Sequence, residues 1–342
     1  MEKKKIVALA GDGIGPEIMA AGLEVLEAVA DFDLEVIEKP FGGAGIDASG
    51  HPLPEETLVA AQTADAILLA AIGSPQYDAA PVRPEQGLLA LRKALGLYAN
   101  IRPVKIYKDL ADLSPLRGDR IQGVDFVVVR ELTGGVYFGD HHLEEKRAYD
   151  INHYARHEIE RIMRTAFEMA QSRDKRVTSI DKANVLATSK LWRQVADHVA
   201  QDYPDVSLEH QLVDSAAMQI ITNPERFDVI VTENLFGDIL SDEASVLSGT
   251  LGVMPSASHG SGPSLYEPIH GSAPDIAGQG IANPISMILS VAMMLRESFD
   301  RSDLAERIEK AVETTLAAGF KTRDLGGETT TKDMTKEIVK RC

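Results

Sequence analysis

Short apolar segments alternate with amphipathic segments along most of the chain, and this alternation restricts the fold more than any other feature. Ile6 to Ala10 and Ala66 to Ile72 are continuous apolar runs of strand length, whereas Glu17 to Val29 and Tyr154 to Gln171 have the periodicity of helices. Continuous apolar strands indicate sheets covered on both faces. The 342 residues suffice for about two domains. We therefore expect an α/β protein with buried sheets flanked by helices.

The same reading assigns the remaining elements. Expected strands are 34–37, 126–129, 177–180 and 229–232, and expected helices are 86–95, 190–200, 235–247, 285–298 and 303–317. The segment 133–152 interrupts the alternation, because it carries Gly134-Gly135 and the aromatic residues Tyr137 and Phe138. It predicts an irregular hairpin or arm that could reach another subunit.

Charge and cysteine content exclude several classes of function. The chain has 35 Lys+Arg against 52 Asp+Glu, a formal net charge of −17. Binding to nucleic acid or to an anionic membrane is therefore not expected. The longest apolar stretches are too short to span a bilayer. Cys342 is the only cysteine, so no intrachain disulfide can form, and we expect a cytoplasmic protein without an export signal.

A glycine-rich turn follows the first expected strand. Gly11, Gly13 and Gly15 precede a helix, and Glu38 ends the second strand about 20 residues on, which is the layout of a dinucleotide-binding fingerprint. The spacing, however, is GxGxG followed by proline instead of GxGxxG. The turn therefore fits a tight strand-to-helix connection better than a diphosphate cradle.

Two carboxylates stand four residues apart just after the strand 229–232. Asp238 and Asp242, in FGDILSDEA, lie on one face of the expected helix. Carboxylate oxygens at this spacing suit Mg²⁺ or Mn²⁺. A solvated acidic face is an equally good interpretation in so acidic a chain.

Several cationic and phenolic side chains could serve an anionic ligand. Arg92 lies on a helix, Arg102 in the following NIRP segment, and Arg130 at the end of a strand. If they converge, their guanidinium groups suit a di- or tricarboxylate, and otherwise they are solvated. Lys182 follows the strand 177–180 and could act as a base, and Tyr137 could donate a proton. The alternatives are a surface lysine and a packed aromatic ring.

The segment from His270 to Pro284, HGSAPDIAGQGIANP, is rich in small residues and precedes a helix. Such a loop lets backbone approach a flat ligand closely. Asp275 could accept a hydrogen bond from a ribose 2′-hydroxyl and would repel a 2′-phosphate. Without a ligand it is only a structured loop.

Six segments together resemble one family, the β-decarboxylating dehydrogenases of the isocitrate/isopropylmalate dehydrogenase type. They are GDGIGPEI, RPEQGLLALRKALGLYANIRP, RELTGGVYFG, SIDKANVL, TENLFGDILSDEAS and HGSAPDIAGQGIANP, and they extend from Gly11 to Pro284. The resemblance implies two domains with a large mixed sheet flanked by helices, and not a standard Rossmann fold. It implies a discontinuous cofactor-binding domain, 1–98 plus 249–342. Residues 99–248 would form a metal, substrate and dimerisation domain, with the arm at about 133–152.

The resemblance also implies roles for individual residues. Substrate carboxylates would be bound by Arg92, Arg102 and Arg130, and Mg²⁺ or Mn²⁺ would be held by Asp238, Asp242 and the Asp214 that a partner subunit donates. Lys182, also from the partner, would assist deprotonation, and Tyr137 would be the general acid. NAD would contact Ile14, Ser74, Glu85, His270, Gly271, Ser272, Ala273, Pro274, Asp275, Ile276, Ala277, Gly278, Gln279, Gly280, Ile281, Ala282 and Asn283. One departure is Ser74, where relatives usually have glycine, and it leaves that loop's detail open.

The expected reaction is NAD-dependent oxidative decarboxylation of 3-isopropylmalate to 4-methyl-2-oxopentanoate and CO₂ in leucine biosynthesis, by a homodimer with shared active sites. Leu88 and Leu89 lie one turn before Arg92, and with Val185 they would bury the isopropyl group, for about 2 kcal/mol. Alternatives are a sister enzyme that acts on homoisocitrate, tartrate or malate, and a non-catalytic metabolite- or nucleotide-binding protein.

Overall fold

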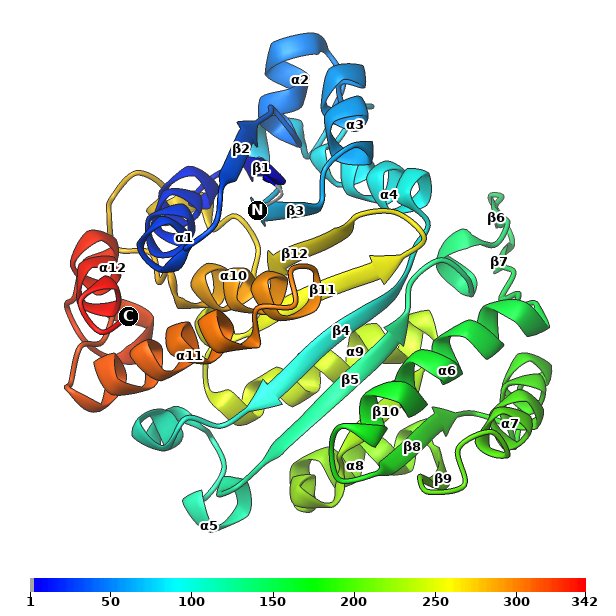
Figure 1. Cartoon of the computed structure of the whole chain (residues 1–342). Helices are drawn as coiled ribbons and strands as arrows, with labels where there is room; N and C mark the ends of the chain where they lie inside the picture. Colours follow the sequence, from blue (N-terminus) through cyan, green and yellow to red (C-terminus); the bar gives the residue numbers. More distant parts are fainter. Residues whose placement is uncertain (1–2) are drawn as a thin grey trace. The chain divides into compact units, whose positions relative to one another are not determined.

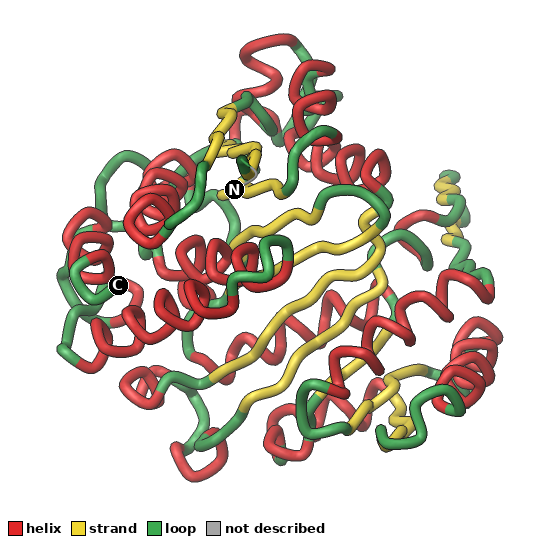
Figure 2. Tube along the Cα trace, in the orientation of Figure 1, coloured by secondary structure: helices red, strands yellow, loops and turns green. Residues whose placement is uncertain are grey.

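The computed structural model describes residues 3–342 and divides into two compact units. Unit 1 comprises Met1–Leu97 and Thr250–Cys342, and unit 2 comprises Tyr98–Gly249. Each unit carries five strands of a mixed sheet and helices that pack on it (Figures 1 and 2). The expected α/β class with a mixed sheet flanked by helices is therefore confirmed. None of the helices formed by residues 3–342 is both long enough and apolar enough to cross a membrane.

Unit 1 contains a sheet with the strand order β2-β1-β3-β12-β11. The strands are β1 (Lys4–Gly11), β2 (Leu34–Glu38), β3 (Ala66–Ala71), β11 (Pro255–Gly260) and β12 (Ser264–Pro268). The pairings are parallel from β2 to β12, and β11 pairs antiparallel with β12. All six residues of β3 are buried, which explains why its sequence is continuously apolar.

Helices cover this sheet on both faces. The helices of this unit are α1 (Gly15–Val29), α2 (Gly43–Ser49), α3 (Glu55–Gln62), α4 (Pro84–Leu95), α10 (Ile285–Glu297), α11 (Ser302–Ala317) and α12 (Thr331–Val339), of which α11 and α12 pack on other helices. Helix α10 is buried along most of its length because it packs on β11 and β12 and contacts α1 and α11 (Figure 1). On the other face, Val7 and Leu9 of β1 belong to one buried cluster with Leu91 and Leu95 of α4.

Unit 2 contains a sheet with the order β4-β5-β10-β8-β9. The strands are β4 (Leu97–Lys105), β5 (Asp125–Glu131), β8 (Arg176–Asp181), β9 (Ser207–Leu212) and β10 (Val229–Thr232). In this sheet the β4–β5 pairing is antiparallel, and the β5–β10, β10–β8 and β8–β9 pairings are parallel. Helices α6 (Arg156–Gln171) and α7 (Ala187–Ala200) pack together on it, as do α8 (Val213–Thr222) and α9 (Asn234–Ser245). From β5 through β8 to β9 the chain moves toward one edge of the sheet, and it then returns to form β10 between β5 and β8. Because such crossovers are right-handed, the pair α6 and α7 lies on one face and the pair α8 and α9 on the other.

The segment that interrupts the alternation forms a small hairpin. Strands β6 (His141–Leu143) and β7 (Ala148–Asp150) pair only with each other. Leu143 is 86% exposed, and Tyr149 and Ile151 are also exposed. The irregular hairpin predicted for this segment is confirmed.

Several sequence-based boundaries were wrong. The segment after α4, to which the sequence pattern assigned no element, is the strand β4, whose Asn100, Arg102 and Pro103 conceal its apolar residues. The helix expected from Tyr154 begins at Arg156, because Tyr154 is a buried residue of the preceding loop. The helix expected to reach Leu247 ends at Ser245. Elements α2, α3, α8, α12, β9, β11 and β12 were not predicted.

Candidate active site

In unit 1 the glycine turn brings β1 against a distant loop. Gly13 has a φ of +58°, and a Cβ on it would lie 2.0 Å from the carbonyl oxygen of Ser272. The next residue, Ile14, donates its backbone N–H to the same oxygen at 2.8 Å. Glycine is therefore required for close backbone packing. This agrees with the tight-turn interpretation and with a fold other than a standard Rossmann domain.

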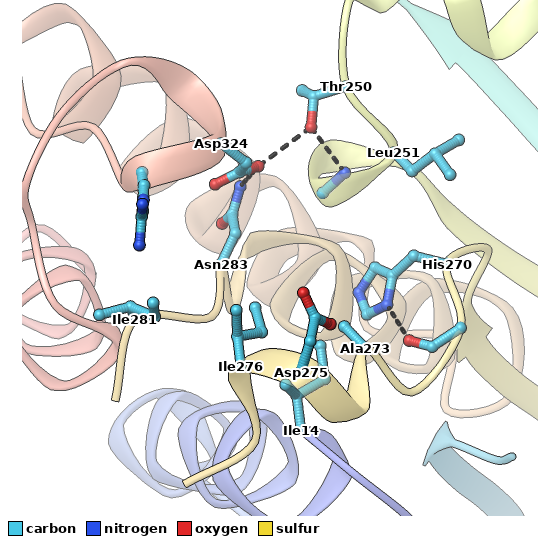
Figure 3. Close-up of a pocket in the computed structure, with 13 residues that line it drawn as sticks. Ile14, Thr250, Leu251, His270, Ala273, Asp275, Ile276, Ile281, Asn283 and Asp324 are labelled. Atoms are coloured by element: carbon cyan, nitrogen blue, oxygen red, sulfur yellow. Dashed lines mark hydrogen bonds between the residues drawn. The ribbon is translucent and has the colours of Figure 1, made fainter. Parts of the chain in front are cut away.

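Unit 1 contains a pocket of about 770 Å³ beside this turn (Figure 3). Its lining includes eight of the 17 cofactor residues predicted from the sequence. These are Ile14, His270, Gly271, Ala273, Asp275, Ile276, Ile281 and Asn283. Sequence reasoning did not find the other five lining residues, Thr250, Leu251, Gly252, Arg323 and Asp324. A pocket of this size is typical of small-molecule and cofactor sites.

The remaining predicted cofactor residues are not among those that line the pocket. They are Ser74, Glu85, Ser272, Pro274, Ala277, Gly278, Gln279, Gly280 and Ala282. Several of them hold the loop in place: Ser272 is buried, and its hydroxyl donates to the carbonyl of Gly73 at 2.6 Å. A Cβ on Gly73 would lie 3.5 Å from the carboxylate of Glu85, so Glu85 approaches this junction as well.

Asp12, which sequence reasoning passed over, fixes the segment before Ser74. Its buried carboxylate accepts backbone N–H groups from Gly43 and Ala44, at 2.9 and 3.0 Å, and from Gly73 at 2.9 Å. Three donors on one carboxylate satisfy its buried charge and join three chain segments. The sequence signal was available, since Asp12 lies inside the glycine turn.

Two polar groups of the pocket have distinct environments. Burial lowers the pKa of His270, whose Nδ1 lies 3.0 Å from the carbonyl oxygen of Gly271 and must donate to it. The ring is therefore neutral at neutral pH. The Asp324 carboxylate accepts from Thr250 and Asn283, both at 3.0 Å, as Figure 3 shows.

Arg92, also in unit 1, is held by an acid. Its Nη2 donates to Glu267 at 2.9 Å, and the two side chains are 13% and 12% exposed. The Arg92 Nε is buried without a hydrogen-bond partner. An unsatisfied buried donor is costly, and this Nε lies out of reach of solvent in the structure. Of its neighbours on α4, Leu88 packs partly against the core and Leu89 is 49% exposed.

In unit 2, Arg130 and Tyr137 meet on one aspartate. Arg130 donates from Nη1 to Asp238 Oδ1, and the Tyr137 hydroxyl donates to Asp238 Oδ2 at 2.7 Å. The guanidinium also lies over the Tyr137 ring, 5.8 Å from its centroid. Burial, and then the hydrogen bond to Asp238, raises the pKa of Tyr137, so its hydroxyl keeps its proton.

Arg102 makes the corresponding contact one turn further along α9. It donates to Ser241 at 2.7 Å and to Asp242 at 3.2 Å, and its Nε donates to Asn100 at 2.8 Å. The structure thus brings Arg102, Arg130, Tyr137, Asp238 and Asp242 together along one helix. Convergence of these two arginines, which spacing alone could not establish, is a property of the fold.

Two further residues, missed by sequence reasoning, support this arrangement. A Cβ on Gly237 would lie 2.6 Å from Arg130 Cγ, so glycine at this position lets α9 approach the arginine. Asn234 accepts from Arg130 Nε and Nη2 at 3.1 and 2.8 Å and donates to the Gly134 carbonyl at 3.1 Å. In the NLFGD motif, Asn234 and Gly237 therefore position Arg130, and Asp238 is a candidate metal ligand.

Lys182 and Asp214 form a separate pair in the same unit. Lys182 Nζ lies 2.5 Å from Asp214 Oδ1, and this contact lowers the pKa of the Asp214 carboxyl. Lys182 follows β8 directly, and Asp214 lies in the first turn of α8. Val185 is 64% exposed.

The donors on α9 fit a hard divalent cation. Asp238 and Asp242 supply carboxylate oxygens from successive turns, and each already carries a positive partner, Arg130 or Arg102. Among residues 3–342 no group of three or more His, Cys, Asp or Glu side chains could hold a metal ion. One chain therefore offers part of a ligand set, which substrate oxygens or another chain would have to complete.

Comparison with known proteins identifies the family to which this chain belongs. A family model described as isocitrate/isopropylmalate dehydrogenase matches residues 5–338, and the chain belongs to that family. The chain is 74% identical over 342 residues to the 3-isopropylmalate dehydrogenase of Streptococcus pneumoniae, with 99% of both chains covered. It is 67% identical to that of Lactococcus lactis, again with 99% of both covered.

Solved structures of dehydrogenases of this type have the same fold as this chain. The isocitrate dehydrogenase of Methylococcus capsulatus has a TM-score of 0.89 at 37% identity and covers 99% of both chains. A β-decarboxylating dehydrogenase of Thermococcus kodakarensis has a TM-score of 0.84 at 38% identity, covering 99% of this chain and 96% of that one.

Proposed function

We propose that the chain catalyses the NAD-dependent oxidative decarboxylation of 3-isopropylmalate to 4-methyl-2-oxopentanoate and CO₂, a step of leucine biosynthesis. The observation that carries this proposal is the meeting of Arg130 and Tyr137 on Asp238, with Arg102 on Asp242 one turn away. The 3-isopropylmalate dehydrogenases at 74% and 67% identity support the choice of substrate.

The arginines neutralise the dianionic substrate. Arg102 and Arg130 exchange an aspartate partner for a substrate carboxylate, and Arg92 contributes the positive charge of its guanidinium. Three arginines at the site would let a chain of net charge −17 hold such an anionic substrate. The isopropyl group packs against Leu88, Leu89 and Val185, for about 2 kcal/mol.

Proton transfers fall to two residues. Lys182 of a partner subunit accepts the hydroxyl proton at Nζ, and Tyr137 delivers its hydroxyl proton to the carbon that loses CO₂. The raised pKa of Tyr137 keeps that proton available. We propose NAD as the hydride acceptor, held by Asp275 and the His270–Asn283 loop with Ile14, Ser74 and Glu85.

Asp238 and Asp242 would hold Mg²⁺ or Mn²⁺ together with Asp214 of the partner subunit. A cation there lowers the pKa of a bound hydroxyl and stabilises enolate charge. The proposal thus requires a homodimer, and we place the enzyme in the cytoplasm. Mixing Lys182→Ala and Asp238→Ala chains, each inactive alone, should restore part of the activity, because one site of the mixed dimer is then intact. Proven mixed dimers without recovery would contradict shared sites.

The direct test is NADH formation from 3-isopropylmalate, NAD⁺ and Mn²⁺, measured at 340 nm alongside CO₂ release. Excess EDTA should abolish turnover. Faster turnover of homoisocitrate, tartrate or malate would identify a sister enzyme instead. Binding without NADH or CO₂ would indicate a non-catalytic protein.

A further inference from the structure

The pocket of unit 1 contains one basic side chain that no predicted role explains. Among its 13 lining residues, Arg323 is the only lysine or arginine, and Asp275 and Asp324 are the only acids. A dinucleotide carries ribose hydroxyls, which donate hydrogen bonds to a carboxylate such as that of Asp275. It also carries negatively charged phosphates, which a guanidinium binds.

The backbone at Arg323 is held firmly at the pocket. It begins a short helical turn, Arg323–Leu325, whose Leu325 is buried. Asp324 accepts from the hydroxyl of Thr322 at 2.6 Å as well as from Thr250 and Asn283. Three neutral donors satisfy the Asp324 carboxylate, so it does not need the neighbouring guanidinium.

The Arg323 side chain itself makes no hydrogen bond or ion pair with any residue from 3 to 342. Arg301 in the same unit behaves differently, because it is bound by both Asp31 and Asp303. In a chain of net charge −17, a guanidinium without an acidic partner at the edge of a pocket is available for an anionic ligand.

We propose that Arg323 binds a phosphate group of the dinucleotide cofactor. The inference rests on the proposed NAD dependence. It adds that Arg323 recognises a phosphate of the cofactor, whereas Asp275 recognises a ribose hydroxyl. The phosphate can be the diphosphate common to NAD and NADP or the 2′-phosphate of NADP, and the probes below distinguish them.

The test is calorimetric binding of adenosine, ADP-ribose and 2′,5′-ADP to the full chain and its variants. Arg323→Gln should leave adenosine binding unchanged. It should weaken ADP-ribose binding about tenfold if the guanidinium contacts the diphosphate, or 2′,5′-ADP binding about tenfold if it contacts the 2′-phosphate. Arg323→Lys should keep part of the affinity, because it retains the charge without the guanidinium fork. The matched control is Lys310→Gln, which removes the same charge from an exposed position on α11. It should behave like the unmodified chain.

Each outcome bears on the inference. A loss confined to the phosphate-bearing probes, larger at 50 than at 200 mM salt, supports it. A loss confined to 2′,5′-ADP supports it and places the guanidinium at the ribose 2′ position. Equal loss for adenosine, or no loss for any probe, overturns it and leaves the proposed function standing. If the unmodified chain binds no nucleotide, both the inference and the proposed NAD dependence fail.

Discussion

The two units prepare their sites in different ways. The unit 1 pocket is shaped by backbone: a glycine turn, a loop of small residues, and carboxylates such as Asp12 that are satisfied by N–H groups. The unit 2 site consists of long charged side chains that neutralise one another, Arg130 with Asp238 and Arg102 with Asp242. Substitutions in unit 1 should therefore change ligand affinity, whereas those in unit 2 should mainly change turnover.

Arg130→Gln should have the largest effect. It leaves Asp238 without its cation and removes both hydrogen bonds that Arg130 donates to the Asn234 side-chain oxygen. We expect kcat/KM for 3-isopropylmalate to fall about a thousandfold, or ~4 kcal/mol. ADP-ribose binding in unit 1 should stay unchanged. Arg226→Gln, which alters an exposed pair with Glu209, is the control. A comparable fall in ADP-ribose affinity would contradict the separation between the units.

Tyr137→Phe should come next. It removes one hydroxyl that donates to Asp238 and keeps the ring under Arg130. If Tyr137 is the final proton donor, steady-state kcat should fall about a hundredfold. A single-turnover burst of NADH should persist in stopped-flow absorbance, because hydride transfer precedes that protonation. Loss of the burst together with kcat would assign Tyr137 to an earlier step.

The contrast between the units also explains what the sequence could predict. Local pattern was enough for buried elements such as β3 and α10 and for placing Asp238 and Asp242 on one helix, since period and spacing decide these features. It failed at β4, whose polar residues hide a strand, and at Asn234 and Gly237, whose roles depend on Arg130 arriving from another strand. Thr250 and Arg323 are likewise distant in sequence from the loop they accompany. Contacts of this kind are set by tertiary packing, which no single segment encodes.

Glu233, directly before α9, offers a stability test confined to unit 2. The residue is 5% exposed, and burial raises its pKa from 4.5 to about 7. A 3.4 Å hydrogen bond from Asn152 acts in the opposite direction and lowers the pKa of Glu233, but by less. Glu131 and Asp181 face it as nearby acids, and Arg193 is bound to Asp181. The folded pKa lies above the unfolded one. The stability that this group contributes is therefore present below about pH 4.5 and lost as pH rises through about 7.

Glu233→Gln cannot ionise and should escape that loss. Between pH 5 and pH 8 its free energy of unfolding should gain about 2 kcal/mol relative to the unmodified chain, measured by urea denaturation. Glu225→Gln, at an exposed position of the same unit, should track the unmodified chain at both pH values. A constant difference between Glu233→Gln and the unmodified chain across this range would show that Glu233 does not titrate there.

The smallest effect is expected in unit 1, at Asp275. If its carboxylate accepts from the ribose 2′-hydroxyl and repels a 2′-phosphate, Asp275→Asn should weaken NAD⁺ binding and narrow the preference for NAD⁺ over NADP⁺ about tenfold, or ~1.4 kcal/mol. The comparison is made on kcat/KM for both nucleotides, with Asp303→Asn as a charge-matched control whose partner is Arg301, outside the pocket. kcat at saturating NAD⁺ should hardly change, because the substitution weakens cofactor binding equally in the ground state and the transition state. A preference that stays the same while kcat falls would mean that Asp275 acts on the reaction and not on the ribose, and the division of labour between the two units would then be wrong.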